Sequence, residues 1–94
     1  MSYQLRYNRQ FMQQLNRLPG DIRSIAQRTI SLLAREQYPP RAKELTNHPS
    51  YYRLWLPRNH RLVYQIVADE QIVHLLYVRP KLPDLYGQLG LGRE

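Results

Sequence analysis

The residues of this sequence best suited to chemistry lie between positions 51 and 65, in the stretch YYRLWLPRNHRLVYQ. Arginine offers a planar fork of donors that matches phosphate, and aromatic rings offer faces on which nucleic-acid bases stack. If the stretch forms a β-hairpin, side-chain alternation along each strand puts Tyr51, Arg53, Trp55 and Arg61 on one face. Two guanidinium groups beside aromatic rings are typical of a surface that holds single-stranded nucleic acid.

The hairpin is predicted from its composition. Tyr, Trp, Val and Leu, which favour strands, dominate both arms. Pro57-Arg58-Asn59 is typical of a turn, because proline fixes φ and asparagine tolerates a positive φ. A three-residue loop there pairs Leu56 with His60 and Trp55 with Arg61. The face opposite the arginines is then apolar and needs a core to cover it. Its members are Tyr52, Leu54, Leu56, Leu62, Tyr64 and Ile66.

Further basic residues follow the last predicted strand. If the turn after Ala68 has three residues, Arg79 lies opposite Arg61. If the turn has two or four, Arg79 falls on the other face and Lys81 becomes the better candidate. Such a cluster could orient a phosphate and stabilise the charge that develops during phosphoryl transfer. The alternative is an ordinary hydrated sheet face on which arginine side chains lie over Trp55.

Tyr86 and His60 complete the set of candidates. Tyr86 sits among Pro and Gly residues, where its ring could stack on a base, donate a hydrogen bond to a phosphate, or pin the chain onto the core. His60, next to Arg61 at the hairpin bend, is the only histidine placed to act as an acid or base. The histidines lack zinc spacing, the carboxylates are scattered, and there is neither a cysteine nor a Gly-rich phosphate loop. We therefore expect no metal site and no cofactor.

The composition limits the class of protein. A length of 94 residues with 43% hydrophobic content predicts one globular domain, residues 1–94, with a flexible tail over 87–94. The net charge is +7 and most of the basic residues are arginine, which favours nucleic acid or an acidic protein as the partner. With no cysteines and no apolar run of membrane-spanning length, we expect a cytoplasmic protein without membrane contact.

Hydrophobic periodicity predicts the elements that must position these residues. Residues 2–7 alternate like a short strand, and the stripe formed by Phe11, Leu15 and Leu18 predicts a helix capped by Asn8. Pro19-Gly20 ends that helix.

A second helix is expected to be capped by Asp21 and to end near Gln37, because Pro39-Pro40 cannot continue it. A polar, Pro-bounded loop over 39–50 follows, in which Leu45 is expected to be buried. The hairpin then extends through Val67, a turn covers 68–71, and Ile72 to Val78 reads as a buried strand. The predicted fold is α+β, in the order β-α-α-β-β-β, with a helical hairpin packed on one face of an antiparallel sheet.

These residues carry a resemblance to a known family. The pattern Tyr-Arg-Leu-x-Leu, a short turn and Arg-Leu-Val-Tyr-Gln-Ile, at Tyr52 to Leu56 and Arg61 to Ile66, resembles the RelE/ParE toxins of bacterial type II toxin–antitoxin systems. Weaker matches are Leu15 to Pro19, Lys43 to Leu45 and Asp84 to Tyr86. The likeness to RelE implies a ribosome-dependent mRNA endonuclease, or mRNA interferase, in which the 2′-OH attacks the adjacent phosphate. It also implies a cognate antitoxin, the ribosome and mRNA as partners, with operator DNA bound only through the antitoxin.

The resemblance also implies roles for individual residues. By position, Arg61 matches the arginine that contacts the scissile phosphate, and Arg53 matches another basic residue of the motif. Lys81 or Arg79 matches the basic residue after the last strand. Tyr86 matches the tyrosine that stacks on and orients the substrate. The implied catalytic set is Arg53, Arg61, Lys81 and Tyr86, and the implied substrate-binding set is Trp55, Arg79 and His60.

The sequence departs from the RelE pattern in two places. Trp55 stands where a second lysine is usual, and Arg79-Pro80-Lys81 replaces Gly-Lys/His-Arg. Because arginine is not deprotonated in proteins, Arg53 is a poor general base, which leaves the proton role to His60 or Lys81. Two other functions stay open: a ParE-like inhibitor of DNA gyrase without nuclease activity, and a non-catalytic module that binds its partner and their operator DNA.

Overall fold

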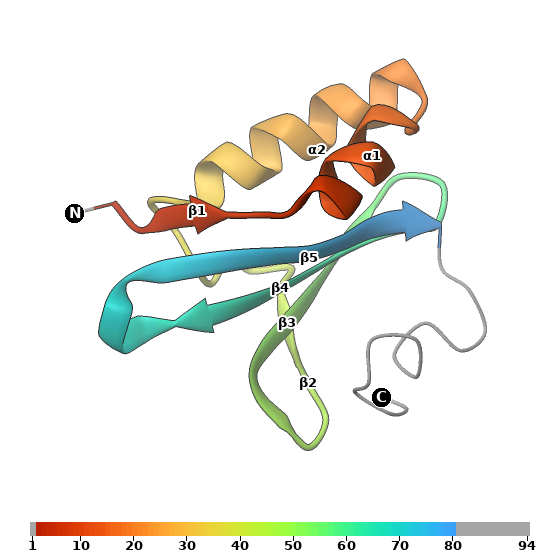
Figure 1. Ribbon diagram of the computed structural model, residues 1–94. Helices are drawn as coiled ribbons and strands as arrows, with labels where there is room; N and C mark the ends of the chain where they lie inside the picture. The colour runs from red at the N-terminus through yellow and green to blue at the C-terminus, as the bar shows by residue number, and fades with distance from the viewer. Residues whose placement is uncertain (1, 81–94) are drawn as a thin grey trace.

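A mixed five-stranded sheet carries both helices on one of its faces (Figure 1). The computed structural model describes residues 2–80. The strands lie in the order β1-β5-β4-β3-β2, and only the β1–β5 pair is parallel. The elements are β1 (Gln4–Arg6), α1 (Arg9–Asn16), α2 (Gly20–Leu33), β2 (Lys43–Leu45), β3 (His48–Leu56), β4 (His60–Val67), the 3-10 turn η1 (Ala68–Glu70) and β5 (Ile72–Pro80).

The predicted α+β fold and its element order are confirmed, with two differences. The segment expected to be a loop contains β2, which pairs antiparallel with β3 and extends the sheet. The sheet is also not purely antiparallel, because β1 pairs parallel with β5 at the edge of the sheet. Leu45 is buried, as predicted. Lys81, Tyr86 and the tail over 87–94 lie outside the described residues.

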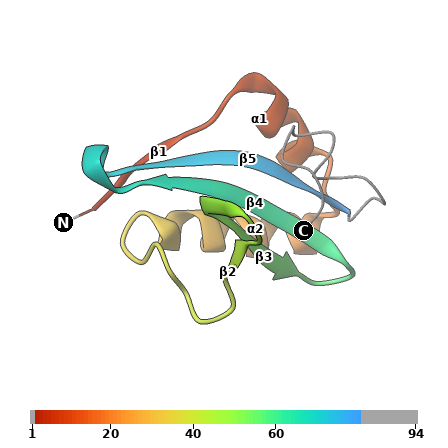
Figure 2. The same ribbon diagram turned by 90° about the horizontal axis from the view of Figure 1, so that it is seen from below.

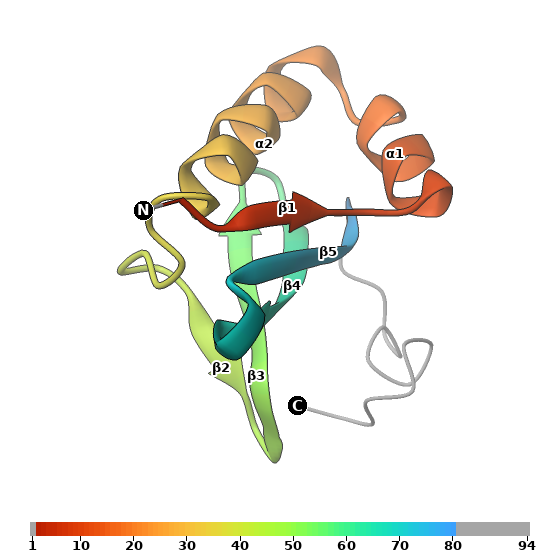
Figure 3. The same cartoon turned by 60° about the vertical axis from the view of Figure 1, so that its left-hand side comes forward.

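Helix α1 begins where the sequence predicted. The side-chain oxygen of Asn8 accepts a hydrogen bond of 2.9 Å from the backbone N–H of Phe11, which caps the helix. The apolar stripe of Phe11, Leu15 and Leu18 is buried against the sheet. The two helices diverge over the sheet (Figure 3), with α1 packed on β5 and α2 packed on β3.

Two expectations for α2 are wrong. Its N-cap is Pro19, and Asp21 lies in the first turn, where it contacts Arg58 instead of capping the helix. The helix ends at Leu33, short of Gln37. The side-chain amide of Gln37 donates hydrogen bonds to the carbonyl oxygens of Leu33 and Ala34, at 3.0 and 2.9 Å, and so satisfies the C-terminal carbonyls. Neither helix within the described residues has the length and apolar content needed to cross a bilayer.

The core lies between the helices and the apolar face of the β3–β4 hairpin. That face is the predicted one: Leu54, Leu56, Leu62, Tyr64 and Ile66 are buried and Tyr52 packs against them. Tyr64 is fully buried, its hydroxyl donates a hydrogen bond of 3.1 Å to the carbonyl oxygen of Gln37, and burial raises its pKa. The segment that follows α2 is therefore tied to the centre of the sheet.

We expect Tyr64→Phe to destabilise the fold by about 1 kcal/mol at neutral pH, because it removes this hydrogen bond. Above the ordinary tyrosine pKa of 10.0 the unfolded chain releases the phenolic proton and the folded chain keeps it, so wild-type stability should fall as pH rises. Urea unfolding at about pH 8 and about pH 11 measures both effects. An equally steep loss of stability in the Phe variant would show that Tyr64 does not cause it.

The outer edge of β5 is protected by α1 where β1 ends. β1 pairs only with Ile72 to His74 of β5. Further along, the side-chain oxygen of Gln14 accepts a hydrogen bond of 3.0 Å from the backbone N–H of Val78, a fully buried residue. A glutamine side chain thus takes the place of a neighbouring strand and fixes the end of β5, which carries Arg79.

We predict that Gln14→Ala costs about 1–3 kcal/mol of unfolding free energy, because it leaves the buried N–H of Val78 without its acceptor. The neighbouring exposed residue provides a matched control, and Gln13→Ala should change stability by no more than about 0.5 kcal/mol. Chemical denaturation of both variants compares them. Equal losses in the two variants would contradict the role given to Gln14.

Candidate nucleic-acid interface

The predicted register of the central hairpin is confirmed pair by pair. Leu56 lies opposite His60, and Trp55 lies opposite Arg61. Tyr51, Arg53, Trp55 and Arg61 therefore project from the face that carries neither α1 nor α2, which Figure 2 shows from below. The turn that sets this register has positive φ at Arg58 (56°) and at Asn59 (65°), of which the sequence predicts only the second.

The position of Arg79 depends on a feature that the sequence does not reveal. Val67 pairs with Ile72, so the β4–β5 connection has four residues, which by simple alternation would turn Arg79 to the helix side. The register shifts by one residue between Val63 and Tyr64, where Leu76 is the extra residue of a β-bulge. The bulge restores the pairing of Arg61 with Arg79. The expectation that a four-residue turn excludes Arg79 is therefore wrong.

Each of these two arginines lies on an aromatic ring. The Cζ atom of Arg61 is 4.1 Å from the ring centroid of Trp55, and that of Arg79 is 4.3 Å from the ring centroid of Tyr77. Cation–π contacts of this kind contribute about 0.5–2 kcal/mol each, depending on how far they are removed from water. The rings hold the planar guanidinium groups in place before any ligand arrives.

The arrangement of charge on this face favours an anion. Arg61 and Arg79 face each other directly on adjacent strands, where like charges repel. On the other side of the hairpin, Arg53 lies opposite Lys43 of β2. A phosphate between such groups accepts charge-assisted hydrogen bonds and relieves the repulsion. We call this surface, comprising Lys43, Arg53, Trp55, Arg61, Tyr77 and Arg79, the guanidinium face.

The guanidinium face is less open than the sequence predicted. Arg61 is only 4% exposed, whereas Arg53, Trp55 and Arg79 are partly exposed. A second apolar cluster of Leu45, Val63 and Tyr77 is buried on the same side of the sheet, with Tyr51 and Leu76 packed against it. These apolar neighbours lower the local dielectric constant, so an ion pair formed with Arg61 is stronger than one formed in water.

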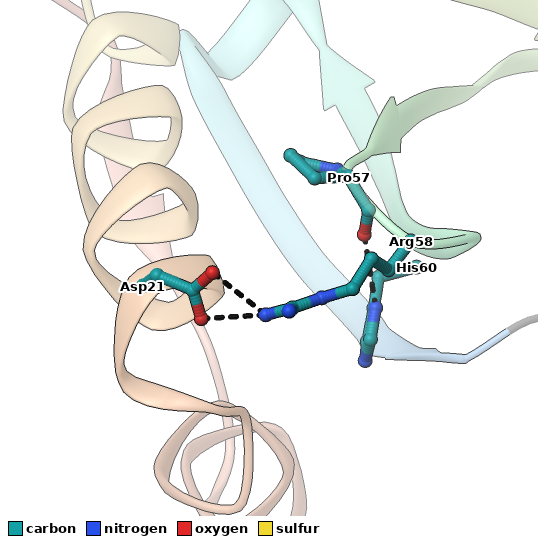
Figure 4. A network of polar contacts seen from close by, with 4 residues as sticks. All are labelled: Asp21, Pro57, Arg58 and His60. Atoms are coloured by element: carbon teal, nitrogen blue, oxygen red, sulfur yellow. Dashed lines mark hydrogen bonds and ion pairs between the residues drawn. The ribbon is translucent and has the colours of Figure 1, made fainter.

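His60 does not belong to the guanidinium face. Strand alternation places it on the helix side of β4, where it is 7% exposed. Its Nδ1 atom lies 3.1 Å from the carbonyl oxygen of Pro57 (Figure 4). A carbonyl oxygen can only accept a hydrogen bond, so Nδ1 carries the proton and Nε2 is the acceptor of the neutral ring. The sequence placed His60 beside Arg61 in one substrate site; the structure puts them on opposite sides of the strand.

Sequence reasoning missed two members of the guanidinium face. Lys43 lies in a segment that the sequence predicts to be a loop, and Tyr77 lies in an apolar run without alternation, so neither could be assigned to a face. The only available signal was the aromatic character of Tyr77 two residues before Arg79. Among residues 2–80, no three His, Cys, Asp or Glu side chains gather in a way that could hold a metal ion.

Comparison with known proteins gives a fold but no match in sequence. No family model and no curated protein matches the chain. Among solved structures, the isolated E. coli RelE toxin has a TM-score of 0.73 at 18% identity, covering 95% of this chain and 96% of RelE. A chain of the RelBE2 toxin–antitoxin complex from Mycobacterium tuberculosis has a TM-score of 0.70 at 22% identity, with coverages of 86% and 100%.

The likeness extends to an archaeal protein. A chain of the RelE–RelB complex from Pyrococcus horikoshii has a TM-score of 0.68 at 20% identity, covering 85% of this chain and 96% of that chain. At identities this low the comparisons establish the architecture alone. The chain has the RelE-like fold, as its sequence pattern predicted.

Because Trp55 is the only tryptophan, its fluorescence reports directly on the guanidinium face. We expect a short single-stranded RNA to change the emission of Trp55, and the apparent affinity to fall steeply with salt as phosphate contacts displace counterions. A fluorescence titration at two salt concentrations measures both. RNA bound by gel shift with no change in Trp55 emission would place its site elsewhere on the protein.

Proposed function

We propose that this chain is the toxin of a toxin–antitoxin pair and acts as a ribosome-dependent mRNA endonuclease. The observation that carries the proposal is the pairing of Arg61 with Arg79, each seated on an aromatic ring and facing the other across adjacent strands. This geometry suits a phosphate. The fold supports the same conclusion, since the structures it resembles include RelE toxins, alone and bound to RelB antitoxins.

The proposed reaction is the attack of a ribose 2′-OH on the adjacent phosphate. A bond forms between O2′ and phosphorus, the bond from phosphorus to O5′ breaks, and the products end in a 2′,3′-cyclic phosphate and a 5′-hydroxyl. Negative charge grows on the non-bridging oxygens in the transition state. Arg61 and Arg79, held by Trp55 and Tyr77, are positioned to stabilise this charge. Arg53, on the adjacent strand β3, would contact a neighbouring phosphate of the RNA backbone.

Proton transfer explains the dependence on the ribosome. The 2′-OH must lose a proton and O5′ must gain one, and a guanidinium cannot serve as the base. The guanidinium face therefore supplies position and charge stabilisation, while alignment of the 2′-OH comes from the ribosome that holds the message. Lys81 and Tyr86, which lie outside the described residues, remain the predicted partners for proton transfer and base stacking.

The proposed partner is a cognate antitoxin with an acidic or amphipathic segment. The net charge of +7 gives such a segment a complementary surface. Binding over the guanidinium face would neutralise the toxin by occupying the position of the phosphate. Operator DNA would then be bound through the antitoxin.

Controlled expression in bacteria tests the activity. We expect growth arrest and new 5′-hydroxyl ends inside translated messages. Arg61→Lys keeps the charge but loses the planar fork and its stack on Trp55, so cleavage should fall by about ten- to a hundredfold, the effect of losing a charged hydrogen bond. Arg35→Lys, an equally conservative change at an exposed position beyond α2, is the matched control and should leave cleavage unchanged.

The same cultures distinguish the alternatives. Growth arrest with intact messages would sink the nuclease proposal, and inhibition of purified gyrase in a supercoiling assay would then indicate a ParE-like activity. Arrest that is unchanged by Arg61→Lys would show that the guanidinium face is not the source of toxicity.

A further inference from the structure

A hollow of mixed character lies between α1, the start of β4 and the end of β5, next to the guanidinium face. Leu18, Pro19 and Pro80 form its apolar lining. Its volume is about 500 Å³, within the range of small-molecule sites. Its polar lining is formed by Gln10, Gln13, Gln14, Arg17, His60 and Arg79. Within the described part of the chain, no Asp or Glu lines it. Amides and cations without a carboxylate make a site for an anionic ligand that also offers hydrogen-bonding edges.

Helical spacing explains why these side chains gather. Residues 10, 13, 14 and 17 recur at i, i+3, i+4 and i+7, which puts them on one side of α1 and its C-terminal end. The neighbouring stripe of the helix, including Phe11 and Leu15, is buried in the core. Gln14 is already engaged with the backbone of Val78, so Gln10, Gln13 and Arg17 supply the exposed groups of this wall.

The facing wall is held in place by the hairpin turn. The bond from His60 Nδ1 to the carbonyl of Pro57 fixes the ring and leaves Nε2 as its acceptor (Figure 4). Next to it, Arg58 binds the carboxylate of Asp21 through contacts of 2.6 and 2.7 Å, which ties the turn to the start of α2. The hollow thus has the held ring of His60 in its wall, together with the amides of α1 and the guanidinium of Arg17, the C-cap of that helix.

Arg79 connects the hollow with the guanidinium face. Its guanidinium stacks on Tyr77 beside Arg61, and the residue also lines the hollow. The guanidinium face and the hollow are therefore adjacent at Arg79. No other described group is shared between the two sites in this way.

We propose that this hollow binds the nucleotide that flanks the phosphate held by Arg61 and Arg79, an assignment that rests on the proposed function. Arg17 contacts the phosphate of that nucleotide. Gln10, Gln13 and Nε2 of His60 contact the edge of its base, where amides both donate and accept. These residues, rather than the guanidinium face, then set any preference for the base beside the cut.

NMR titration with an uncleavable 2′-O-methyl RNA hexamer tests the assignment. We expect saturable shifts of the His60 ring and of the Gln13 side-chain amide. Arg17→Ala should weaken binding by about tenfold, the loss expected for a charged hydrogen bond. Arg35→Ala also removes one exposed arginine, but away from the hollow, and should change affinity by less than about twofold. Gln13→Glu places a carboxylate in the hollow and should also weaken binding, without loss of volume.

The outcomes separate this inference from the proposed function. If Trp55 responds to the hexamer while His60 and Gln13 do not, the hollow is not a nucleotide site, although the guanidinium face still binds RNA. If the signals of His60 and Gln13 respond and Arg17→Ala abolishes the response, the hollow is a nucleotide-binding site. This conclusion holds even if cells that express the protein show no message cleavage. Equal affinities for the Arg17→Ala and Arg35→Ala proteins would overturn the assignment. If the Arg17→Ala protein does not fold, the affinity of the Gln13→Glu protein is compared with that of the Arg35→Ala protein instead. Equal affinities in that comparison would overturn the assignment.

Discussion

The pairing of β3 with β4 is the constraint on which the rest of the structure depends. A slip of one residue would exchange the faces of the hairpin, bury Arg53 in the core and expose Leu54. The turn resists such a slip because both Arg58 and Asn59 adopt positive φ, a geometry that fits few loop lengths. The ion pair between Arg58 and Asp21 is 60% and 66% exposed, so it contributes little energy by itself. The register is held chiefly by the apolar face that the helices cover.

The bulge in β5 has a comparable importance for the site. Without the extra residue at Leu76, the strand would bring Val78 opposite Arg61 and turn Arg79 toward the helices. One inserted residue therefore decides whether two guanidinium groups meet on the face opposite the helices. The contact between Gln14 and Val78 then fixes the strand end from the outer side. The backbone geometry of β5 thus decides where the charged side chains of the site lie, and residue type alone does not.

The two sides of the sheet differ in what they pack against. The helix side carries the main core, and the other side carries a smaller apolar cluster around Val63 that surrounds the arginines. The aromatic rings of Trp55 and Tyr77 offset part of the cost of holding Arg61 and Arg79 close together. A surface that gathers like charges in this way fits a protein whose partners are acidic.

The sequence by itself determined the elements other than β2, the hairpin register and the α+β fold class. These depend on the spacing of apolar residues and on turn chemistry, which are local, so the alternation of the strand was enough to assign Leu54 and Trp55 to opposite faces. Tertiary structure alone decided the capping of α2, the existence of β2, the bulge at Leu76, the burial of Arg61 and the separation of His60 from it. Each of these depends on contacts between segments distant along the chain, where packing and edge pairing override what neighbouring residues prefer.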